Sequence, residues 1–333
     1  MAGCAATPPI GDSAEGRAPD PITTRERVEI NGRTHGLVIR GTDRSNPILL
    51  WVAGGPGGSE LGWARTYLED LEQSVVFVHW DQPGTGFAGA IDWEEATVED
   101  FVQDTLSVTE YLTKRFSQQQ VILVGHSWGT IIGLRAVHRR PELYSAYVGV
   151  AQQVNSTEND LHGYQLALRE AERRGHHRVA RRLRRNGPPP YSQDDGGRYL
   201  FLFQKVHIYS PHPAPEPRFA SMMFPREYRL QDSIHLVRGL LRGVANVYPQ
   251  LRGLDFETEI PTLDVPVYFF TGRHDETCVQ DIAWRYYQNL QAPHKEFIWF
   301  ENAGHNVPYQ DPERFMQTMR ERVLESSQHR RNL

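Results

Sequence analysis

The chain has 333 residues, of which 39% are hydrophobic and 23% are charged, so it can bury a sizeable core and is not disordered throughout. Its 36 Lys and Arg residues against 41 Asp and Glu residues give a net charge of −5, which argues against a general nucleic-acid-binding protein. Two cysteines, Cys4 and Cys278, cannot form a disulfide framework, and no apolar run approaches the roughly 18 residues of a transmembrane helix.

Residues 1–22 are predicted to form a disordered tail, because four prolines lie there among small and polar residues with little to bury. This region lacks the charged and then apolar segments of a signal peptide, so we expect a cytoplasmic protein. The alternative comes from Ala2-Gly3-Cys4, which resembles the end of a bacterial lipoprotein signal. In that case the protein is exported, Cys4 carries the lipid, and the preceding apolar segment has been removed.

Short apolar runs rich in Val, Ile and aromatic residues recur along the rest of the chain. The first expected pair of strands, 28–40, turns at Asn31-Gly32, a favoured hairpin dipeptide. The later runs are typical of strands buried on both faces of a parallel sheet, and they lie at 48–52, 75–78, 121–124, 147–150, 267–270 and 296–300. Helical segments, with Thr97 and Asp311 as expected N-caps, lie between several of them, at 60–72, 98–116, 129–139, 279–290 and 312–326. This alternation predicts an α/β fold with a mostly parallel central sheet flanked by helices.

Between residues 152 and 255 the alternation stops. An Arg-rich helical stretch at 166–185, proline-rich loops and a second helical stretch at 234–247 replace it. We therefore expect 23–151 and 256–333 to form the core and 152–255 to form a mainly helical cap inserted into it. The arginines of the first stretch are interpreted as a solvated helix face rather than an anion or nucleic-acid site, because the chain is acidic overall.

The segment Gly125-His126-Ser127-Trp128-Gly129 matches the G-x-S-x-G pattern between an expected strand and an expected helix, the context of a nucleophile elbow. The flanking glycines permit the sharp turn that lifts the Ser127 hydroxyl above the sheet edge. The N-terminus of the following helix favours negative charge that develops beside the serine. Ser127 is therefore predicted to be a nucleophile, the alternative being a coincidental glycine-rich turn.

A serine nucleophile needs a base, and the base needs an orienting acid. In this kind of fold the chain order is serine, acid, histidine. Asp275 follows the strand at 267–270 and His305 follows the strand at 296–300, so these two residues are predicted to complete a triad. The other acids are less well placed relative to their strands: Asp81, Asp264 and Asp281.

The oxyanion of a tetrahedral intermediate needs two N–H donors. The amide of Trp128, which follows the nucleophile, is predicted to be one of them. The glycine-rich loop 53–58 follows the strand at 48–52, and its amides can turn toward the substrate. Gly55 is the preferred second donor and Gly54 is the alternative.

Taken together, these motifs resemble the proline iminopeptidase-like family of α/β-hydrolases. The resemblance spans about residues 25–150 and 256–326 and is carried by Gly54-Gly55-Pro56-Gly57, Asp81-Gln82-Pro83-Gly84-Thr85-Gly86, Gly125-His126-Ser127-Trp128-Gly129, Gly272-Arg273-His274-Asp275 and Gly304-His305. It implies an α/β-hydrolase fold with a helical cap over the active site. It also implies that Ser127, Asp275 and His305 form the catalytic triad.

The sequence departs from this family at several positions. Ala53 and Pro83 stand where the family usually has His and Arg. Iminopeptidases also carry a Trp- and Glu-containing cap motif that holds the free amino group of the substrate, but residues 152–255 contain no Trp. The cap residues considered for substrate binding are Glu216, Glu227 and Phe224, with Glu158 and Asp232 as further carboxylates and Tyr199, Phe201, Phe203, Tyr209 and Phe219 as further aromatic residues.

Three functions are weighed on this basis. The first is a serine hydrolase that cleaves a small amide or short peptide with a free N-terminal residue through an acyl-enzyme. The second is an esterase, thioesterase or lactonase for a small molecule or specialised metabolite, and the third is a non-catalytic binding scaffold. A buried carboxylate near the pocket favours the first, and an apolar pocket without one favours the second. No cofactor is expected, and no metal, because His176-His177 lacks companion ligands.

Overall fold

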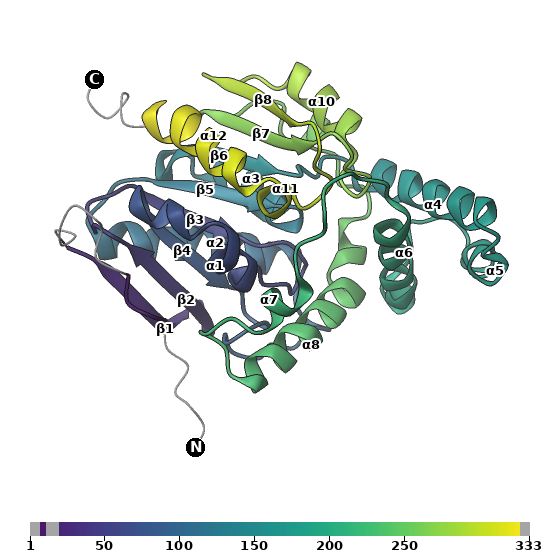
Figure 1. The fold of residues 1–333 in the computed structure, drawn as a ribbon, viewed down its shortest axis with the longest axis horizontal. Coiled ribbons are helices and arrows are strands. Elements are labelled where there is room, and N and C mark those ends of the chain that lie inside the picture. The colour runs from purple at the N-terminus through teal and green to yellow at the C-terminus, as the bar shows by residue number, and fades with distance from the viewer. Residues whose placement is uncertain (1–6, 11–19, 327–333) are drawn as a thin grey trace.

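The computed structural model describes residues 7–10 and 20–326, which include an eight-stranded sheet with helices on both sides (Figure 1). The strands lie in the order β1-β2-β4-β3-β5-β6-β7-β8. The pairs β1–β2 and β2–β4 are antiparallel, and the remaining neighbours are parallel. The strands are β1 (Ile22–Ile30), β2 (Arg33–Gly41), β3 (Ile48–Val52), β4 (Val76–Asp81), β5 (Val121–His126), β6 (Tyr144–Val150), β7 (Val267–Gly272) and β8 (Lys295–Phe300).

The helices fall into two groups. Those that flank the sheet are α1 (Leu61–Tyr67), α2 (Val98–Phe116), α3 (Trp128–Arg139), α9 (Phe256–Glu259), α10 (Gln280–Asn289), α11 (Val307–Gln310) and α12 (Pro312–Thr318). A second group lies between β6 and α9: α4 (Ser156–Arg173), α5 (His177–Asn186), α6 (Gly196–Tyr209), α7 (Phe219–Met223) and α8 (Leu230–Asn246). In Figure 1 much of this second group extends away from the sheet, and α5 lies at the far tip. The fold class expected from the sequence is confirmed, while the division at 152 and 255 stays a prediction.

The central strands are apolar at nearly every position because both faces of the sheet are covered. All of β3 and β5 is buried. Leu50 and Leu123 belong to the hydrophobic cluster on one face, and their neighbours Trp51 and Val124 belong to the cluster on the other face. Since successive side chains of a strand point to opposite faces, a strand covered on both sides reads as a continuous apolar run.

Most helix signals of the sequence correspond to local structure, with two differences. Thr97 forms a capping box with Asp100 at the start of α2, as its position before the helix predicts. Asp311 is the N-cap residue of α12, as its position predicts, but its side chain makes no capping hydrogen bond; Pro312 follows it at the first helical position. The helix expected at 60–72 is divided into α1 and a 3₁₀ helix over Glu69–Gln73.

The N-terminal tail lies largely outside the described residues, as does Cys4, so its proposed lipidation has no structural counterpart here. The short described stretch 7–10 contacts the core: Arg40 donates from Nη1 to the Thr7 hydroxyl at 2.7 Å. Across the described part of the chain, none of the helices has both the length and the apolar character needed to span a membrane.

Candidate active site

Ser127 lies at the turn between β5 and α3, in a backbone conformation that non-glycine residues rarely adopt. Its φ is 53° and its ψ is −116°, so the turn stores strain at this residue. A Cβ at Gly129 would collide with the carbonyl oxygen of Val52, and one at Gly125 would lie 2.5 Å from the Gly129 carbonyl oxygen. Both glycines of the motif are therefore required by close backbone approach as β5 turns into α3.

Asp275 and His305 meet beyond the ends of β7 and β8. The two oxygens of Asp275 lie 3.1 and 3.0 Å from Nδ1 of His305. Asp275 is fully buried and also accepts hydrogen bonds from the amides of Thr277 at 2.8 Å and Cys278 at 2.9 Å. A carboxylate held in this way orients the ring and leaves Nε2 of His305 for another partner.

Ser127 and His305 line the same cavity, which has a volume of about 430 Å³. The helices α6, α7 and α8 supply most of its apolar wall. The apolar lining residues from these helices, with Trp63 and Ile131 from the core, are Leu200, Phe203, Phe219, Met222, Leu236, Leu240 and Val244. The sequence-predicted cap aromatics Phe203 and Phe219 thus reach the cavity, whereas Tyr199 and Tyr209 are buried in the hydrophobic cluster.

The loop after β3 presents its amides beside Ser127. The amide of Gly54 already donates to Glu60 Oε1 at 3.0 Å. Among the described residues the amide of Gly55 has no such acceptor, and Gly55 has a φ of 151°, which favours glycine. Of the two predicted donors in this loop, Gly55 is therefore the one that remains available to a ligand, together with the first amide of α3 at Trp128.

Beneath this loop, Glu60 and His126 form a buried pair that the sequence did not point to. Glu60 accepts hydrogen bonds from His126 Nδ1 at 2.6 Å, from Trp51 Nε1 at 2.8 Å, from the Tyr309 hydroxyl at 2.9 Å and from Gly54. His126 donates from Nε2 to the carbonyl oxygen of His305 at 3.0 Å. The pair therefore joins the loop after β3, through the Gly54 amide, to the backbone at His305.

The surroundings of Glu60 and of His126 each favour the charged form of the side chain. Burial by itself would raise the pKa of Glu60, but His126 and the hydrogen-bond donors outweigh it and lower the pKa below 4.5. Burial by itself would lower the pKa of His126, but Glu60 outweighs it and raises the pKa above 6.5. Both ring nitrogens of His126 then donate, which matches the two acceptors that they face.

This pairing predicts a pH dependence of stability. The wild type should have a higher free energy of unfolding than His126→Asn. We expect this margin to be largest between pH 4.5 and 6.5, the ordinary pKa values of the two groups. The margin falls as the pH rises through the raised pKa of His126, and also as it drops through the lowered pKa of Glu60. Urea unfolding of both proteins across this range measures it, and a margin that stays constant from acid to alkaline pH contradicts the charged pair.

At one place the wall of the cavity is polar. The Tyr248 hydroxyl donates to Asp160 Oδ1 at 2.8 Å and receives a hydrogen bond from Gln153 Nε2 at 3.4 Å. Gln153 and Tyr248 line the cavity, and Asp160 lies behind Tyr248. Burial raises the pKa of Asp160 to about 7, and hydrogen bonds from Tyr248 and Tyr199 only partly oppose it. Among the described residues, no cationic side chain contributes to this shift, so a cationic ligand group would stabilise the charged form of Asp160.

Cys278 is buried beside Ser127 and Asp275. Burial raises the pKa of its thiol well above the usual range, with Asp275 adding to the effect and Ser127 opposing it. Asp275, Cys278 and His305 each place one possible metal-ligand atom within 4.8 Å of the others. The Asp275 oxygens are already bonded to His305 and to two amides, so hydrogen bonding explains this arrangement without a metal.

The three cap residues considered for substrate binding lie in different places. Glu216 accepts a hydrogen bond at 2.8 Å from Asn306 Nδ2, and Asn306 lines the Ser127 cavity, so Glu216 lies one residue behind its wall. Glu227 and Phe224 are not brought to this cavity and instead line a second one, of about 620 Å³. The other carboxylates are paired elsewhere: Glu158 with Arg285 and Asp232 with Arg25.

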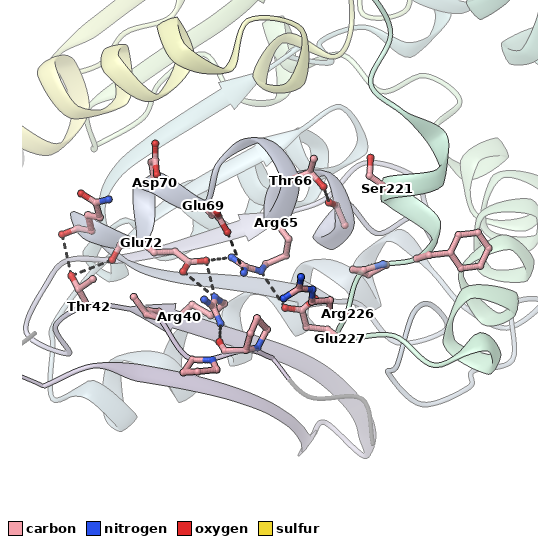
Figure 2. A pocket seen from close by; sticks show the side chains of 17 residues that line it. Arg40, Thr42, Arg65, Thr66, Glu69, Asp70, Glu72, Ser221, Arg226 and Glu227 are labelled. Atoms are coloured by element: carbon pink, nitrogen blue, oxygen red, sulfur yellow. Dashed lines mark hydrogen bonds and ion pairs between the residues drawn. The ribbon is translucent and has the colours of Figure 1, made fainter. Parts of the chain in front are cut away.

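The second cavity is a cluster of charges between the core and the segment before α8. Figure 2 shows Arg40, Arg65, Glu72 and Glu227 pointing toward one another. Arg40 Nε lies 2.8 Å from Glu72 Oε1, and Arg65 bonds both to Glu72 and, at 3.1 Å, to Glu227 Oε1. Thr7 also donates to Glu227, at 3.0 Å. Glu227 is thus engaged with groups that hold this segment against the core.

Comparison with known proteins defines the class. A family model described as the alpha/beta hydrolase family matches residues 49–318, so the chain belongs to that family. It is 31% identical over 303 residues to the protein named "Probable aminopeptidase YbaC" of Bacillus subtilis (strain 168), covering 90% of this chain and 95% of that protein. The predicted resemblance to proline iminopeptidase-like proteins is confirmed.

Solved structures show the same fold. VinJ matches with a TM-score of 0.69 and 21% identity, covering 91% of this chain and 98% of that one. The proline iminopeptidase of Mycobacterium smegmatis matches with a TM-score of 0.66 and 15% identity, also covering 91% of this chain and 98% of that one.

Proposed function

We propose that this chain is a serine hydrolase that acts through a Ser-His-Asp triad and an acyl-enzyme. The observation that carries the proposal is that the strained Ser127 and the His305–Asp275 pair line one cavity. His305 Nε2 takes the proton as the Ser127 hydroxyl attacks a carbonyl, and Asp275 stabilises the ring when it becomes charged. The amides of Gly55 and Trp128 donate hydrogen bonds to the developing oxyanion. The charged His305 then gives its proton to the leaving group as the bond to the carbonyl carbon breaks, and water releases the acyl group from Ser127.

The substrate that this site favours is a small amide with a free N-terminal amino group. The carbonyl attacked by Ser127 and the α-amino group are only two bonds apart, so the amino group must bind close to the serine. Gln153 and Tyr248 offer oxygen acceptors there, and Asp160 behind them supplies negative charge. The aminopeptidase name of the relative that is 31% identical agrees with this choice. Glu216, one residue behind Asn306, is the other carboxylate that could take the amine.

A matched set of substrates tests the proposal. Alanyl and prolyl 4-nitroanilides carry the free amine, and in their N-acetylated forms a neutral, larger acetamide replaces it. We expect kcat/KM to be at least about 100-fold higher for the free amines, because each acetylated form leaves the carboxylate without its cationic partner. Equal rates for free and acetylated forms contradict amine recognition while leaving the serine chemistry intact.

Asp160 is expected to control amine binding in a pH-dependent way. Asp160→Asn should raise KM for alanyl 4-nitroanilide by about 10-fold or more, because it removes a charge from a buried site. In the wild type this KM should also rise as the pH falls below about 7, because Asp160 then becomes neutral. Steady-state kinetics across this pH range measure both effects.

Two further isosteric variants complete that measurement, one as a control and one as a test of the alternative carboxylate. Glu227→Gln, in the second cavity, should leave KM within about two-fold, since Glu227 does not line the Ser127 cavity. Glu216→Gln distinguishes the two carboxylates near the site. A large rise in KM for Glu216→Gln with none for Asp160→Asn would assign the amine to Glu216.

The second candidate is an esterase for an apolar acyl group. One observation favours it: among the described residues, Glu60 is the only carboxylate that lines the cavity, and its four hydrogen-bond donors belong to the protein itself. Turnover of 4-nitrophenyl butyrate with no turnover of any free-amine anilide would support this activity over the first.

A further inference from the structure

The outward face of α8 carries an apolar stripe that no other element of the described residues covers. Leu230, Ile234, Val237 and Leu241 follow one another at helical spacings of four, three and four residues, which places them on one side of the helix. They are between 40% and 70% exposed. Phe219 and Phe224, 64% and 62% exposed, belong to the neighbouring α7 and the residue after it. We call these six residues the outer apolar patch.

The two helices lie against each other, so the patch is continuous. Met222 and Met223 of α7 form a cluster with Leu236 of α8, and Ser233 donates to the Met223 carbonyl oxygen at 2.6 Å. Figure 1 shows α7 and α8 next to each other at the outside of the molecule. Six large apolar side chains at one surface exceed the scattered exposure that is normal for a water-soluble protein.

The segment that carries the outer apolar patch, residues 218–246, is itself net positive, although the whole chain has a net charge of −5. The segment 218–246 carries exposed arginines and no exposed acid, because Glu227 and Asp232 are buried against Arg65 and Arg25. Five arginines of this segment are exposed and form no ion pair within the described structure: Arg218, Arg226, Arg229, Arg238 and Arg242.

We propose that the outer apolar patch and its arginines bind the surface of an anionic lipid bilayer. Apolar side chains bordered by arginines on one helical face are the features that place a helix at the headgroup boundary of a membrane. The arginines complement anionic headgroups, and the apolar residues enter the acyl region. This proposal concerns binding alone and does not rest on the proposed hydrolase activity.

The position of the patch relative to the Ser127 cavity gives the binding a consequence. Leu236, Leu240 and Val244 lie on the neighbouring side of α8 and line the cavity, and Phe219 belongs to both surfaces. Binding through the patch would therefore place one wall of the Ser127 cavity next to the bilayer surface.

A second copy of the chain fits the patch less well. In a two-fold symmetric dimer the same surface meets itself, so the arginines of one copy would face those of the other. Such like-charge contacts oppose association, whereas an anionic bilayer neutralises every one of them.

The test is co-sedimentation with vesicles of phosphatidylcholine, with or without about one third phosphatidylglycerol. We expect the full chain to bind the anionic vesicles at low salt and to be released at high salt. Because each arginine near such a surface contributes about five-fold to partitioning, Arg238→Gln/Arg242→Gln should weaken binding about 30-fold. Ile234→Ser/Leu241→Ser should weaken it at least about 10-fold.

The matched control is Arg181→Gln/Arg185→Gln on α5, which removes the same charge from exposed arginines outside the patch. It should leave binding within about two-fold. The proposal is overturned if the wild type ignores anionic vesicles at low salt, or if the α5 and α8 arginine variants lose binding equally. It is also overturned if the protein forms a dimer that Ile234→Ser/Leu241→Ser dissociates, because the patch then belongs to a second copy.

Discussion

Ser127→Ala is expected to lower kcat by about 10⁴-fold or more for any arylamide that the wild type hydrolyses. The substitution removes the hydroxyl oxygen that would form the proposed acyl-enzyme, while the amides of Gly55 and Trp128 and the apolar wall remain in place. Binding should therefore change little, and the loss should fall on kcat rather than on KM. Release of 4-nitroaniline under saturating substrate measures it directly.

A control variant separates chemistry from folding. Ser107→Ala removes a half-buried serine of α2 that bonds to Asn31 and does not line the Ser127 cavity, and it should leave kcat unchanged within about two-fold. Both variants should unfold at the wild-type temperature within a few degrees, given that neither removes packed apolar volume. A loss of less than about 100-fold in Ser127→Ala would mean that another group is the nucleophile.

Glu60→Ala is expected to be the most destabilising single substitution near the site. Its carboxylate accepts four hydrogen bonds, one of them from the charged His126, and all the partners are buried or at the cavity wall. Removing one member of a buried ion pair leaves the other charge without compensation, which costs about 3–5 kcal/mol in the free energy of unfolding. Urea unfolding near pH 6 measures this cost.

The same variant should also slow catalysis. Glu60 holds the Gly54 amide, and His126 holds the His305 carbonyl, so loss of the pair loosens both sides of the reacting centre. A displacement of about 1 Å there costs up to about 100-fold in kcat. Glu69→Ala, on the exposed 3₁₀ helix after α1, is the matched control and should cost less than about 1 kcal/mol. A Glu60→Ala protein as stable as that control would contradict the charged pair.

Features set by short stretches of sequence could be predicted. The elbow at Ser127 could be found because two glycines, a strand and a helix all fall within one local segment. Asp275 and His305 could be named because each directly follows an apolar run, and the carboxyl ends of parallel strands meet at one edge of the sheet. Strand β3 could be identified because coverage of both sheet faces leaves a continuous apolar run.

Features that depend on distant contacts could not. Glu60 and His126 are 66 positions apart, and Asp160 and Tyr248 are 88 apart, so no local pattern joins either pair. Glu227 was a reasonable substrate ligand by composition, but its place is decided by Arg65, which lies 162 positions earlier. One feature of the sequence could have pointed to the buried pair. His126 is the variable residue before Ser127 in the G-x-S-x-G pattern, and a charged side chain buried there needs a carboxylate nearby.

Mapping the residue that a fluorophosphonate modifies tests whether Ser127 is the nucleophile. This reagent phosphonylates an activated serine hydroxyl and leaves a stable adduct that peptide mass spectrometry can locate. We expect a single adduct on Ser127, formed by the wild type and absent from Ser127→Ala. Labelling should be strongly slowed in Asp275→Asn, because His305 loses its orienting carboxylate. An unlabelled but folded wild type, or an adduct on any other residue, would contradict the central claim that Ser127 is the nucleophile.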